Sequence, residues 1–429
     1  MSNLLCRKVP PTRRLLWLVL ALSSLACGPT PPSIVVVTLD TLRTDHVGAY
    51  GSEPSPTPHL DRLADAGLVH DAAFTTMPTT GPAHLSLFTG LYPSQHGGTR
   101  NAVPLSPQHA GRDAARKLRK NGYATGAFVT SWLAGREATG LQGFEVYDEP
   151  HSMLRPGDDA VDAALAWLDG NPGRPTLLWV HLYDAHAPYG DIGEKGRSFP
   201  VDDKLYGWID EERFASGELS DQLAERYARG VRDADAALGR LLAGLRERGQ
   251  EPLLIVAADH GESLDEHMAS RSYGFDHGEF LDEETVRIPL VVSGPGVTPG
   301  RSAGAASLRD LYTTLLAAAG VEDPEAAAEG RRDLRQADDS ARVVAVERRS
   351  FDSEVPALVA AHAAGAADGT TWVVVAPSAE ATLGGDEASD ELLAEAQAHA
   401  RAAADAATKT PPNFSPETLE ALRQLGYVE

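Results

Sequence analysis

The sequence predicts an α/β protein in which a mostly parallel β-sheet is sandwiched by helices. The first observation is a set of continuous apolar runs, rich in β-branched residues, of the kind that form strands buried on both faces. These runs lie at residues 33–39, 124–129, 176–180, 253–258 and 288–292. The second observation is that the runs alternate with segments of helical periodicity, and this alternation is typical of parallel sheets with crossover helices.

Helices are predicted between and after these strands. Leu60–Ala66 and Arg112–Asn121 have helical character, and a longer amphipathic helix extends from Ser220, a suitable N-cap, to Leu245. Leu308–Ala319 follows as a further helix. We therefore expect residues 33–320 to form the principal domain, with ample length for a hydrophobic core.

The character of the chain changes beyond Gly300. Residues 322–341 and 376–408 are acidic, rich in alanine and without clear periodicity, so only the segments at 342–346 and 370–375 have strand character. A last helix is predicted at 416–425. We expect residues 321–429 to form a small C-terminal α+β subdomain that packs on the principal domain.

The first 27 residues have the features of a secretory signal peptide. Two arginines precede an apolar run from Leu15 to Leu22, which is too short to span a membrane. A small residue then precedes Cys27, as in a bacterial lipoprotein cleavage box with a lipidated cysteine. The alternative is an ordinary signal peptide cut nearby. Either reading places the protein in a bacterial cell envelope, lipid-anchored to the membrane through Cys27 or periplasmic or extracellular.

The chain is strongly acidic, with a formal charge of −23 at pH 7. Loss of residues 1–26 removes four basic residues and no acidic one, which changes this charge to −27. Such a surface argues against nucleic acid as a partner, and an anionic substrate needs cations placed locally at its site. Because Cys6 and Cys27 are the only cysteines, the mature chain has neither a disulfide framework nor a catalytic cysteine.

Carboxylate and imidazole side chains follow three of the predicted strands at the point where each ends. Asp40 follows the first strand, the segment His181–His186 follows the strand at 176–180, and Asp259 and His260 follow the strand at 253–258. Parallel sheets bind ligands beyond the carboxyl ends of their strands. A mixed oxygen and nitrogen set of this kind suits one divalent cation, whereas each group taken alone could be a cap or a salt bridge.

Residues 74–98 combine a turn rich in threonine, proline and glycine with a following helix. Thr80 lies at the start of this helix, where the peptide dipoles and free N–H groups favour an anion. We therefore interpret Thr80 as the candidate nucleophile, activated by a cation that lowers the pKa of its hydroxyl. Taken alone, the segment could equally be a turn that only begins a helix.

Several linked motifs resemble the sulfatase family of the alkaline phosphatase superfamily. They stand in that family's order and cover about 33–299 and the last dozen residues, with the sequences VVVTLDTLRTDHVGAYG, TTGPAHLSLFTGLYPSQHG, HLYDAHAPY, AADHGESLDEH, FDHG and LRQLGYVE. The resemblance implies the alkaline-phosphatase-like fold, with 33–320 as a sulfatase-like catalytic domain, and the hydrolysis of anionic esters in small molecules or glycans.

The resemblance also implies roles for individual residues. It places Asp40, Asp259 and His260 at metal-ligand positions, and it places Thr80 at the position of a nucleophile that also touches the metal. The remaining matches are a catalytic basic residue and substrate-binding residues, namely His84, His186, His277 and Asn101. The implied cofactor is one divalent cation, which could be Mn, Ca, Zn or Mg.

The departures from the family pattern concern the reaction itself. Sulfatases carry cysteine or serine at the nucleophile position, followed by x-Pro-x-Arg, and convert that residue to formylglycine. Here Thr80 stands first and His84 last, and threonine cannot become formylglycine because its oxidation would leave a methyl ketone. Thr41 replaces a second aspartate, and residues 129–132 replace a lysine-containing segment. Threonine nucleophiles do occur in the phosphoryl-transferring relatives.

We therefore expect a metal-dependent hydrolase or transferase of phosphate or sulfate esters with a threonine nucleophile, and favour phosphate over sulfate. One alternative is a catalytically inactive, sulfatase-like envelope lipoprotein that acts as a binding protein. Another is a second zinc held by Asp184, His186 and His277. We interpret Arg43 as part of a structural ion pair. Five further histidines are expected at the surface, namely His59, His70, His109, His151 and His362.

Overall fold

The computed structural model describes residues 31–151, 153–189, 207–208, 218–340, 342–348, 359–366, 369–375, 382–384, 394, 397–399, 401 and 414–424. The predicted signal peptide with Cys27 and most of the segment 190–217 lie outside these residues. The chain from Pro32 to Glu429 forms one compact unit. Among the described residues, the helices are all too short or too polar to cross a membrane.

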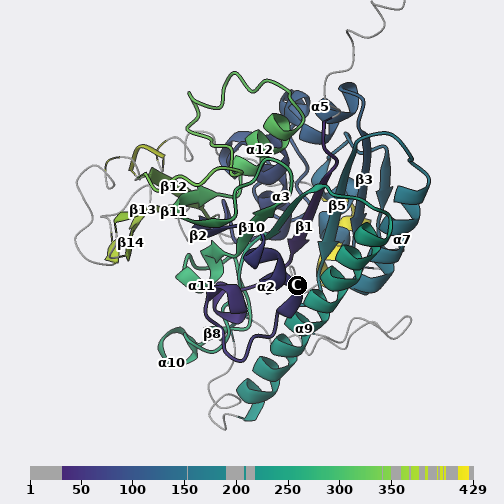
Figure 1. Ribbon diagram of the computed structural model, residues 1–429. Helices are drawn as coiled ribbons and strands as arrows, with labels where there is room; N and C mark the ends of the chain where they lie inside the picture. The colour runs from purple at the N-terminus through teal and green to yellow at the C-terminus, as the bar shows by residue number, and fades with distance from the viewer. Residues whose placement is uncertain are drawn as a thin grey trace, which may run out of the picture. The chain divides into compact units, whose positions relative to one another are not determined.

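A nine-stranded mixed sheet forms the centre of this unit (Figure 1). Its order is β11 (Gly300–Ser307), β2 (Leu68–Phe74), β10 (Leu290–Ser293), β7 (Leu253–Ala258), β1 (Ile34–Leu39), β5 (Thr176–Leu182), β3 (Ala124–Val129) and β4 (Val146–Asp148), with β9 (Arg287–Ile288) paired to β2. Seven of these strands run in one direction, and β9 and β10 run antiparallel to their neighbours. The predicted mostly parallel sheet is confirmed.

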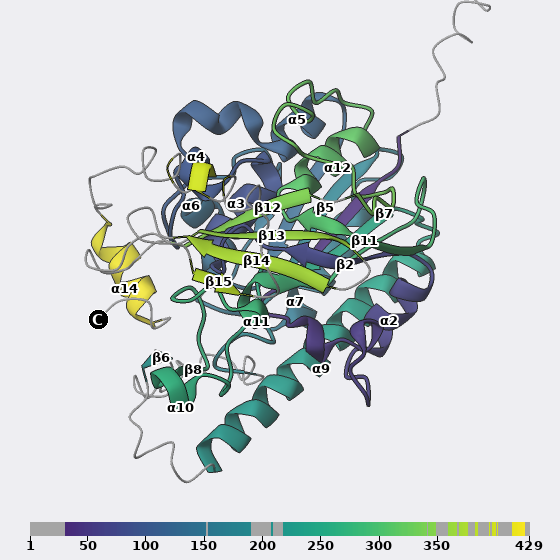
Figure 2. The ribbon, with the colours of Figure 1, turned by 90° about the vertical axis from the view of Figure 1, so that its left-hand side faces the viewer.

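Helices cover both faces of the sheet (Figure 2). One group contains α2 (Pro58–Asp65), α7 (Gly157–Asp169) and α9 (Glu218–Glu247), and the other contains α3 (Thr80–Thr89), α5 (Ala114–Lys120) and α12 (Asp310–Ala318). Trp179 of β5 packs on Phe88 of α3, whereas Phe128 of β3 packs on Trp167 of α7. Phe128 of β3 pairs with Val180 of β5, the residue after Trp179. Because neighbouring residues of a strand point to opposite faces, the side chains of Phe128 and Trp179 lie on opposite faces of the sheet.

The register of the three central strands aligns their carboxyl ends. Leu39 of β1 pairs with Leu182 of β5 and with Ala258 of β7. Asp40 and Asp259 are the next residues on two adjacent strands, so both carboxylates leave the sheet at the same edge. All six residues of β1 are buried, as its β-branched sequence predicts.

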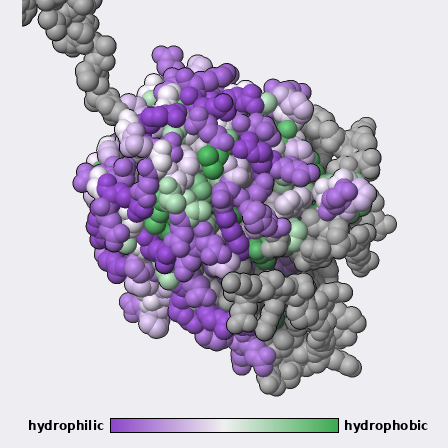
Figure 3. All heavy atoms as spheres, turned by 90° about the vertical axis from the view of Figure 1, so that its right-hand side faces the viewer, coloured by the Kyte–Doolittle hydropathy of each residue, from purple (hydrophilic) through white to green (hydrophobic). Residues whose placement is uncertain are grey.

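Shorter elements connect these layers or cover their ends. They are α4 (Pro93–His96), α6 (Arg136–Thr139), α10 (Met268–Arg271), α11 (Glu283–Val286), α14 (Pro416–Gln424), β6 (Gly207–Trp208), β8 (Tyr273–Gly274) and the 3-10 helices Thr44–His46, Gly48–Tyr50, Pro107–Arg112 and Trp132–Ala134. On the face in Figure 3 hydrophilic residues predominate, in keeping with the acidic composition.

A second, four-stranded antiparallel sheet follows the main one. It consists of β12 (Arg342–Glu347), β13 (Val359–Ala366), β14 (Gly369–Val375) and β15 (Thr382–Gly384). β12 contacts β11, and its Val344 and Val346 share a buried cluster with Phe74 of β2. The strand character predicted for 342–346 and 370–375 is confirmed, but β13 and β15 were not predicted.

Two features of the main sheet differ from the expectation. The run at 288–292 is divided between β9 and β10 and lies antiparallel to the central strands. β2, β4 and β11 were not predicted, because none of them has the apolar run of a buried strand. Ser220 was predicted as an N-cap, but it lies inside α9, where its Oγ donates to Asp265 at 2.6 Å.

Candidate active site and metal centre

Asp40, Asp259 and His260 meet at the carboxyl edge of β1 and β7. His260 Nε2 lies 3.7 Å from Asp40 Oδ1 and 3.6 Å from Asp259 Oδ2, and all three side chains are fully buried. One ligand atom from each residue lies within 4.8 Å of the others. Three groups from two strand ends are thus brought together as the strand-end pattern predicted.

Three ligand atoms of this group face one another without a hydrogen bond to the described chain. Asp40 Oδ1, Asp259 Oδ2 and His260 Nε2 are buried and make no hydrogen bond among the described residues. His260 Nδ1 lies 2.9 Å from the carbonyl oxygen of Gly261, so it carries the ring proton and Nε2 presents a lone pair. Burial raises the pKa of Asp40 and of Asp259. Two carboxylate oxygens and one imidazole nitrogen in a buried position fit one divalent cation, whose charge would offset this cost.

Thr80 is the first residue of α3 and lies beside this group. Its hydroxyl donates to Asp40 Oδ2 at 3.4 Å, and its side chain is buried. The preceding Thr79 instead donates its hydroxyl to the carbonyl oxygen of Pro78 at 2.8 Å. Of the two neighbouring threonines, only Thr80 therefore directs its hydroxyl toward the carboxylates.

His84, one helical turn later, has both ring nitrogens in use. Nδ1 donates to the carbonyl oxygen of Thr80 at 2.7 Å, and Nε2 accepts from the Thr38 hydroxyl at 2.9 Å. Nδ1 also lies 3.7 Å from Asp259 Oδ2. Burial lowers the pKa of His84 to about 3, so the ring is neutral. These contacts connect His84 to the backbone of the candidate nucleophile and leave no ring atom for a substrate.

His181 belongs to the same centre but was not among the predicted site residues. It lies on β5, and its Nε2 donates to Asp40 Oδ2 at 3.0 Å. Burial lowers its pKa to about 4. His181, His84 and Asp259 form a second buried group with ligand atoms within 4.8 Å of one another. The signal was present, because His181 precedes the end of a strand adjacent to β1.

The predicted substrate-binding histidines lie side by side. The His277 ring is 4.9 Å from that of His186 and 4.3 Å from that of His260. His186 Nδ1 donates to the Ala187 carbonyl at 2.7 Å, its Nε2 accepts from the Tyr183 hydroxyl at 3.0 Å, and burial lowers its pKa to about 4. His277 differs, because its Nε2 is buried without a hydrogen-bond partner among the described residues.

Asn101 lies beside the first turn of α3, and only one of its two side-chain amide atoms has a hydrogen-bond partner among the described residues. Its Oδ1 accepts from the backbone N–H of Gly81 at 2.8 Å, and its Nδ2 is buried without a partner in the described chain. Ala102 follows with φ 61°, a left-handed conformation that is rare for alanine. It shares a buried cluster with Leu133 and with Leu422 of α14, so the last helix supports this segment.

Asp184 and Arg43 lie in structural contacts. Asp184 Oδ1 accepts from the backbone N–H of Gly157 at the start of α7 at 3.2 Å, and burial raises its pKa to about 6. None of the possible metal groups in the described residues contains Asp184, so the second-zinc arrangement gains no support. Arg43 pairs with Asp45 at 2.7 Å and with Glu266 at 2.5 Å, as a structural ion pair would.

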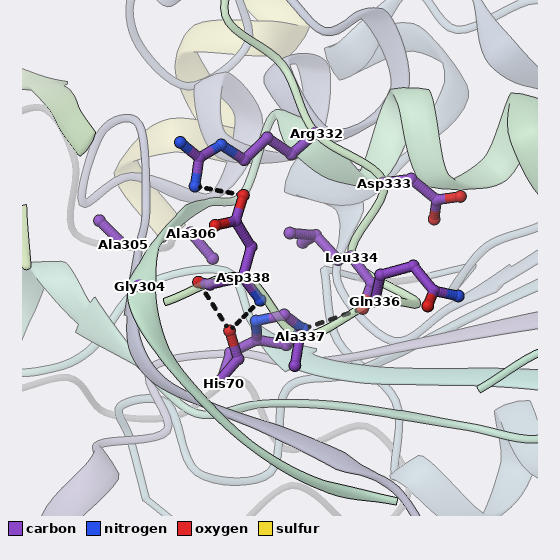
Figure 4. Close-up of a pocket in the computed structure, with 11 residues that line it drawn as sticks. His70, Gly304, Ala305, Ala306, Arg332, Asp333, Leu334, Gln336, Ala337 and Asp338 are labelled. Atoms are coloured by element: carbon purple, nitrogen blue, oxygen red, sulfur yellow. Dashed lines mark hydrogen bonds and ion pairs between the residues drawn. The ribbon is translucent and has the colours of Figure 1, made fainter. Parts of the chain in front are cut away.

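A hollow of about 320 Å³ lies away from this centre, at the β2 and β11 edge of the sheet (Figure 4). Its polar groups are paired with one another, since Arg332 contacts Asp338 at 2.8 Å and the Ser302 hydroxyl donates to the Asp338 carbonyl at 3.1 Å. His70 was predicted at the surface but is only 2% exposed, because its ring contacts the Leu334 carbonyl at 2.9 Å.

Comparison with known proteins agrees with this architecture. The model of the sulfatase family matches residues 32–321. The chain is 26% identical over 398 residues to the multifunctional alkaline phosphatase superfamily protein PehA of Trinickia caryophylli, with 69% of this chain and 75% of that protein covered. It is 27% identical over 355 residues to N-acetylgalactosamine-6-sulfatase of Rattus norvegicus, with 72% and 66% covered.

A solved structure extends the similarity to the fold. The crystal structure of the phosphonate monoester hydrolase of Agrobacterium radiobacter superposes with a TM-score of 0.62 at 18% identity, over 92% of this chain and 96% of that one. The family match covers well over half of the chain and includes every residue of the buried centre. The chain therefore belongs to the sulfatase family of ester hydrolases, within the alkaline phosphatase superfamily.

Proposed function

We propose that this protein is a metal-dependent hydrolase or transferase of phosphate or sulfate esters in which Thr80 is the nucleophile. One observation carries the proposal. The Thr80 hydroxyl donates to Asp40 at 3.4 Å, next to three buried ligand atoms that have no hydrogen-bond partner among the described residues. A buried centre of this composition has little reason to persist in a purely structural protein, because unpaired buried charge is costly.

Asp40, Asp259 and His260 would hold one divalent cation, with the Thr80 oxygen beside it. When bound, such a cation lowers the pKa of a neighbouring hydroxyl and stabilises negative charge on the ester oxygens. Residues of the chain position the nucleophile and accept its hydrogen. His84 fixes the Thr80 backbone through its carbonyl oxygen, and the Asp40 carboxylate is the nearest acceptor for the hydroxyl hydrogen.

Two donors are available for the oxygens of the transferred group. His277 Nε2 and Asn101 Nδ2 are buried and have no partner in the described chain, whereas both ring nitrogens of His186 are occupied. Preorganised donors that face developing negative charge are a main source of rate enhancement in group transfer. We assign His277 and Asn101 to this role, and we assign His186 to the wall of the site.

The threonine favours phosphate over sulfate as the transferred group. Its oxygen forms a bond to phosphorus while the ester bond to the leaving alcohol breaks and that alcohol takes up a proton. Water, or an acceptor alcohol, then forms a new bond to phosphorus and gives up a proton, while the bond to Thr80 breaks and the Thr80 oxygen takes up a proton. The formylglycine hydrate of sulfatases releases sulfate by elimination, and a threonine ester offers no such route. A phosphoryl ester of threonine can be released by simple displacement.

The test is turnover of nitrophenyl esters by the metal-loaded protein. A panel of phosphate monoester, phosphodiester, phosphonate and sulfate substrates is compared between the wild type, Thr80→Ala and Thr79→Ala. We expect the wild type to prefer a phosphorus ester, Thr80→Ala to be inactive, and Thr79→Ala to resemble the wild type, because the Thr79 hydroxyl faces the Pro78 carbonyl. Full activity in Thr80→Ala would overturn the proposed nucleophile.

The alternative, an inactive binding lipoprotein, rests on three departures from the family pattern: Thr41 replaces the second aspartate, His84 replaces the arginine, and residues 129–132 replace the lysine-containing segment. The departure at His84 does not remove this position from the centre, because His84 contacts the Asp259 carboxylate and the Thr80 carbonyl. Metal content of the purified protein separates the two functions. A site that stays empty after supply of Mn²⁺, Zn²⁺ and Ca²⁺ would favour the inactive form.

We also propose that the protein acts in the bacterial cell envelope, anchored through lipid on Cys27. The support is the apolar run from Leu15 to Leu22 and the small residue, Ala26, that directly precedes Cys27. Expression of the full chain with radiolabelled palmitate, followed by membrane fractionation, tests this. Cys27→Ser should lose the label, and equal labelling of the variant would exclude the anchor.

A further inference from the structure

Glu262 lies beside His277 because two short segments pair in this part of the chain. Ser263 and Asp276 form an isolated antiparallel bridge, with Ser263 N–H donating to the Asp276 carbonyl at 3.0 Å and Asp276 N–H donating back at 3.2 Å. In an antiparallel pair the neighbouring residues 262 and 277 also oppose each other. The backbone therefore brings Glu262 and His277 together before their side chains interact.

The two side chains form a buried carboxyl–imidazole pair. Glu262 Oε1 lies 3.1 Å from His277 Nδ1, and the two residues are 1% and 7% exposed. The second carboxyl oxygen, Oε2, accepts from the Tyr189 hydroxyl at 3.2 Å. The Arg43 guanidinium donates to the backbone carbonyl of Glu262 at 3.2 Å. The two carboxyl oxygens of Glu262 are thus held by the His277 ring and by the Tyr189 hydroxyl.

This arrangement determines which atom of His277 faces the centre. Because Nδ1 is held by Glu262, the unpartnered Nε2 is the atom left for a ligand. An anionic ester oxygen at this position requires a hydrogen on Nε2, and the contact between Glu262 and Nδ1 leaves Nε2 to carry it.

We propose that Glu262 is a positioning residue that fixes the His277 ring and its tautomer, so that Nε2–H is directed at an oxygen of the transferred group. This inference rests on the proposed function, because it assigns a partner to one of the two donors of that site. The class of ligand it implies is a tetrahedral oxyanion, such as a phosphate ester or vanadate.

The experiment compares three variants by kcat and KM, by orthovanadate affinity and by metal content. In Glu262→Gln the amide N–H can donate to Nδ1 and the amide oxygen can accept from Tyr189, so the tautomer is kept. Glu262→Met has a similar volume but holds neither partner. Glu284→Met is the matched control, because Glu284 Oε1 also contacts a histidine, His267 Nε2, at 2.5 Å but lies outside the centre.

We expect Glu262→Met to lose about 10- to 100-fold in vanadate affinity and in kcat/KM at unchanged metal content. Glu262→Gln should stay within about 3-fold of the wild type, since it replaces both hydrogen bonds. Glu284→Met should match the wild type in vanadate affinity and in kcat/KM. A Glu262→Met protein that binds vanadate as tightly as the wild type, or a Glu262→Gln protein as impaired as Glu262→Met, would overturn the proposed role.

A double-mutant cycle shows whether Glu262 acts through His277. If it does, Glu262→Met should add little to the loss already caused by His277→Ala, whereas independent effects would add. Additive losses would contradict the positioning role. A second readout needs no metal or turnover. In the metal-free protein labelled with ¹⁵N-histidine, the signal removed by His277→Ala should report the Nε2–H form in the wild type and in Glu262→Gln but not in Glu262→Met.

Failure of the proposed function and failure of the Glu262 role would give different results. If the proposed function is wrong, the metal-loaded wild type will show neither ester turnover nor vanadate binding, or Thr80→Ala will keep full activity. If only the role of Glu262 is wrong, the wild type will be active and Thr80→Ala inactive, while Glu262→Met behaves like the wild type or adds fully to His277→Ala.

Discussion

The Thr80 hydroxyl donates a hydrogen bond to Asp40 Oδ2 at 3.4 Å, although the two residues lie on different elements, α3 and the end of β1. The contact brings the candidate nucleophile to the edge of the sheet where Asp259 and His260 also emerge. It explains how a threonine, which is weakly nucleophilic by itself, can be activated by the group around it. The predictions below follow from this geometry.

Metal binding should stabilise the protein, and the gain should depend on Asp259. One divalent cation per chain is expected at Asp40, Asp259 and His260, because each of these residues offers a buried ligand atom without a hydrogen bond in the described chain and the three lie within 4.8 Å of one another. A ligand bound only by the folded state at 100 times its Kd adds about 2.7 kcal/mol, which is several degrees in Tm. Differential scanning fluorimetry with and without Mn²⁺ measures this gain. Asp259→Asn should lose most of it, and an equal gain in that variant would place the cation elsewhere.

The stabilisation by metal should increase with pH. Burial raises the pKa of Asp40 and of Asp259 above the ordinary value of 3.8, so in the metal-free protein these groups favour folding only while protonated. That contribution is lost as the pH rises from about 4 toward their pKa values in the folded state. Bound metal reverses the effect, because it stabilises the ionised carboxylates. The difference in Tm between loaded and metal-free protein should therefore be larger at pH 7.5 than at pH 4.5, and a constant difference would contradict this.

Asp184→Asn should stabilise the fold and leave the metal site intact. Burial raises the pKa of Asp184 to about 6, so its ionisation destabilises the folded state above that pH. A shift from 3.8 to about 6 corresponds to at most about 3 kcal/mol, present above pH 6 and absent below pH 4. The asparagine can still accept from the Gly157 N–H. Urea unfolding at pH 5 and pH 8 measures the gain, and a loss of bound metal in this variant would revive the second-zinc alternative.

Two polar substitutions of His84 should differ in activity. His84→Asn places an amide near the position of Nδ1 and can keep the contact with the Thr80 carbonyl, whereas His84→Gln mimics Nε2 and can keep only the contact with Thr38. If His84 acts by holding Thr80, the asparagine variant should retain about 10-fold more kcat/KM than the glutamine variant at similar metal content. Equal activities would indicate that His84 acts mainly by filling space.

The last helix should contribute to activity although it lies far from the centre in sequence. Leu422 packs against Ala102, which has φ 61° and follows Asn101 directly. Leu422→Ala should cost about 2–4 kcal/mol locally, and it should raise KM by weakening support for Asn101. Glu417→Ala, on the exposed side of α14, is the control and should be neutral. Unchanged KM in Leu422→Ala, with the helix still folded, would separate α14 from the site.

The strands that could be predicted are those whose residues are buried on both faces. β3 and β7 begin and end at the predicted residues, because their apolar runs stop at polar residues. β2 contains His70 and Asp71 in its middle, so its strand conformation depends on pairing with β10 and β11. β13 is rich in alanine, which has low strand propensity, and it too is stabilised by its neighbours.

In the candidate site, too, some residues could be predicted from the sequence and others could not. Asp40, Asp259 and His260 could be placed together because parallel strand ends share one edge. His181 was placed in the segment after the strand at 176–180 but received no role, and the structure shows it inside β5, where it contacts Asp40. Glu262 lies in the motif AADHGESLDEH but received no role, because its pairing with His277 depends on the bridge between Ser263 and Asp276. Contacts that depend on loop pairing leave no periodic signal in a sequence.

The most direct test is to trap the covalent intermediate on the metal-loaded protein. Turnover of a nitrophenyl phosphate ester is stopped with acid, which preserves phosphothreonine, and the peptide that contains residues 74–98 is sequenced by mass spectrometry. We predict a single phosphoryl group on Thr80 and none on Thr79, with no trapped group in Thr80→Ala. A phosphoryl group on any other residue, or an active Thr80→Ala enzyme, would contradict the proposal that Thr80 accepts the transferred group.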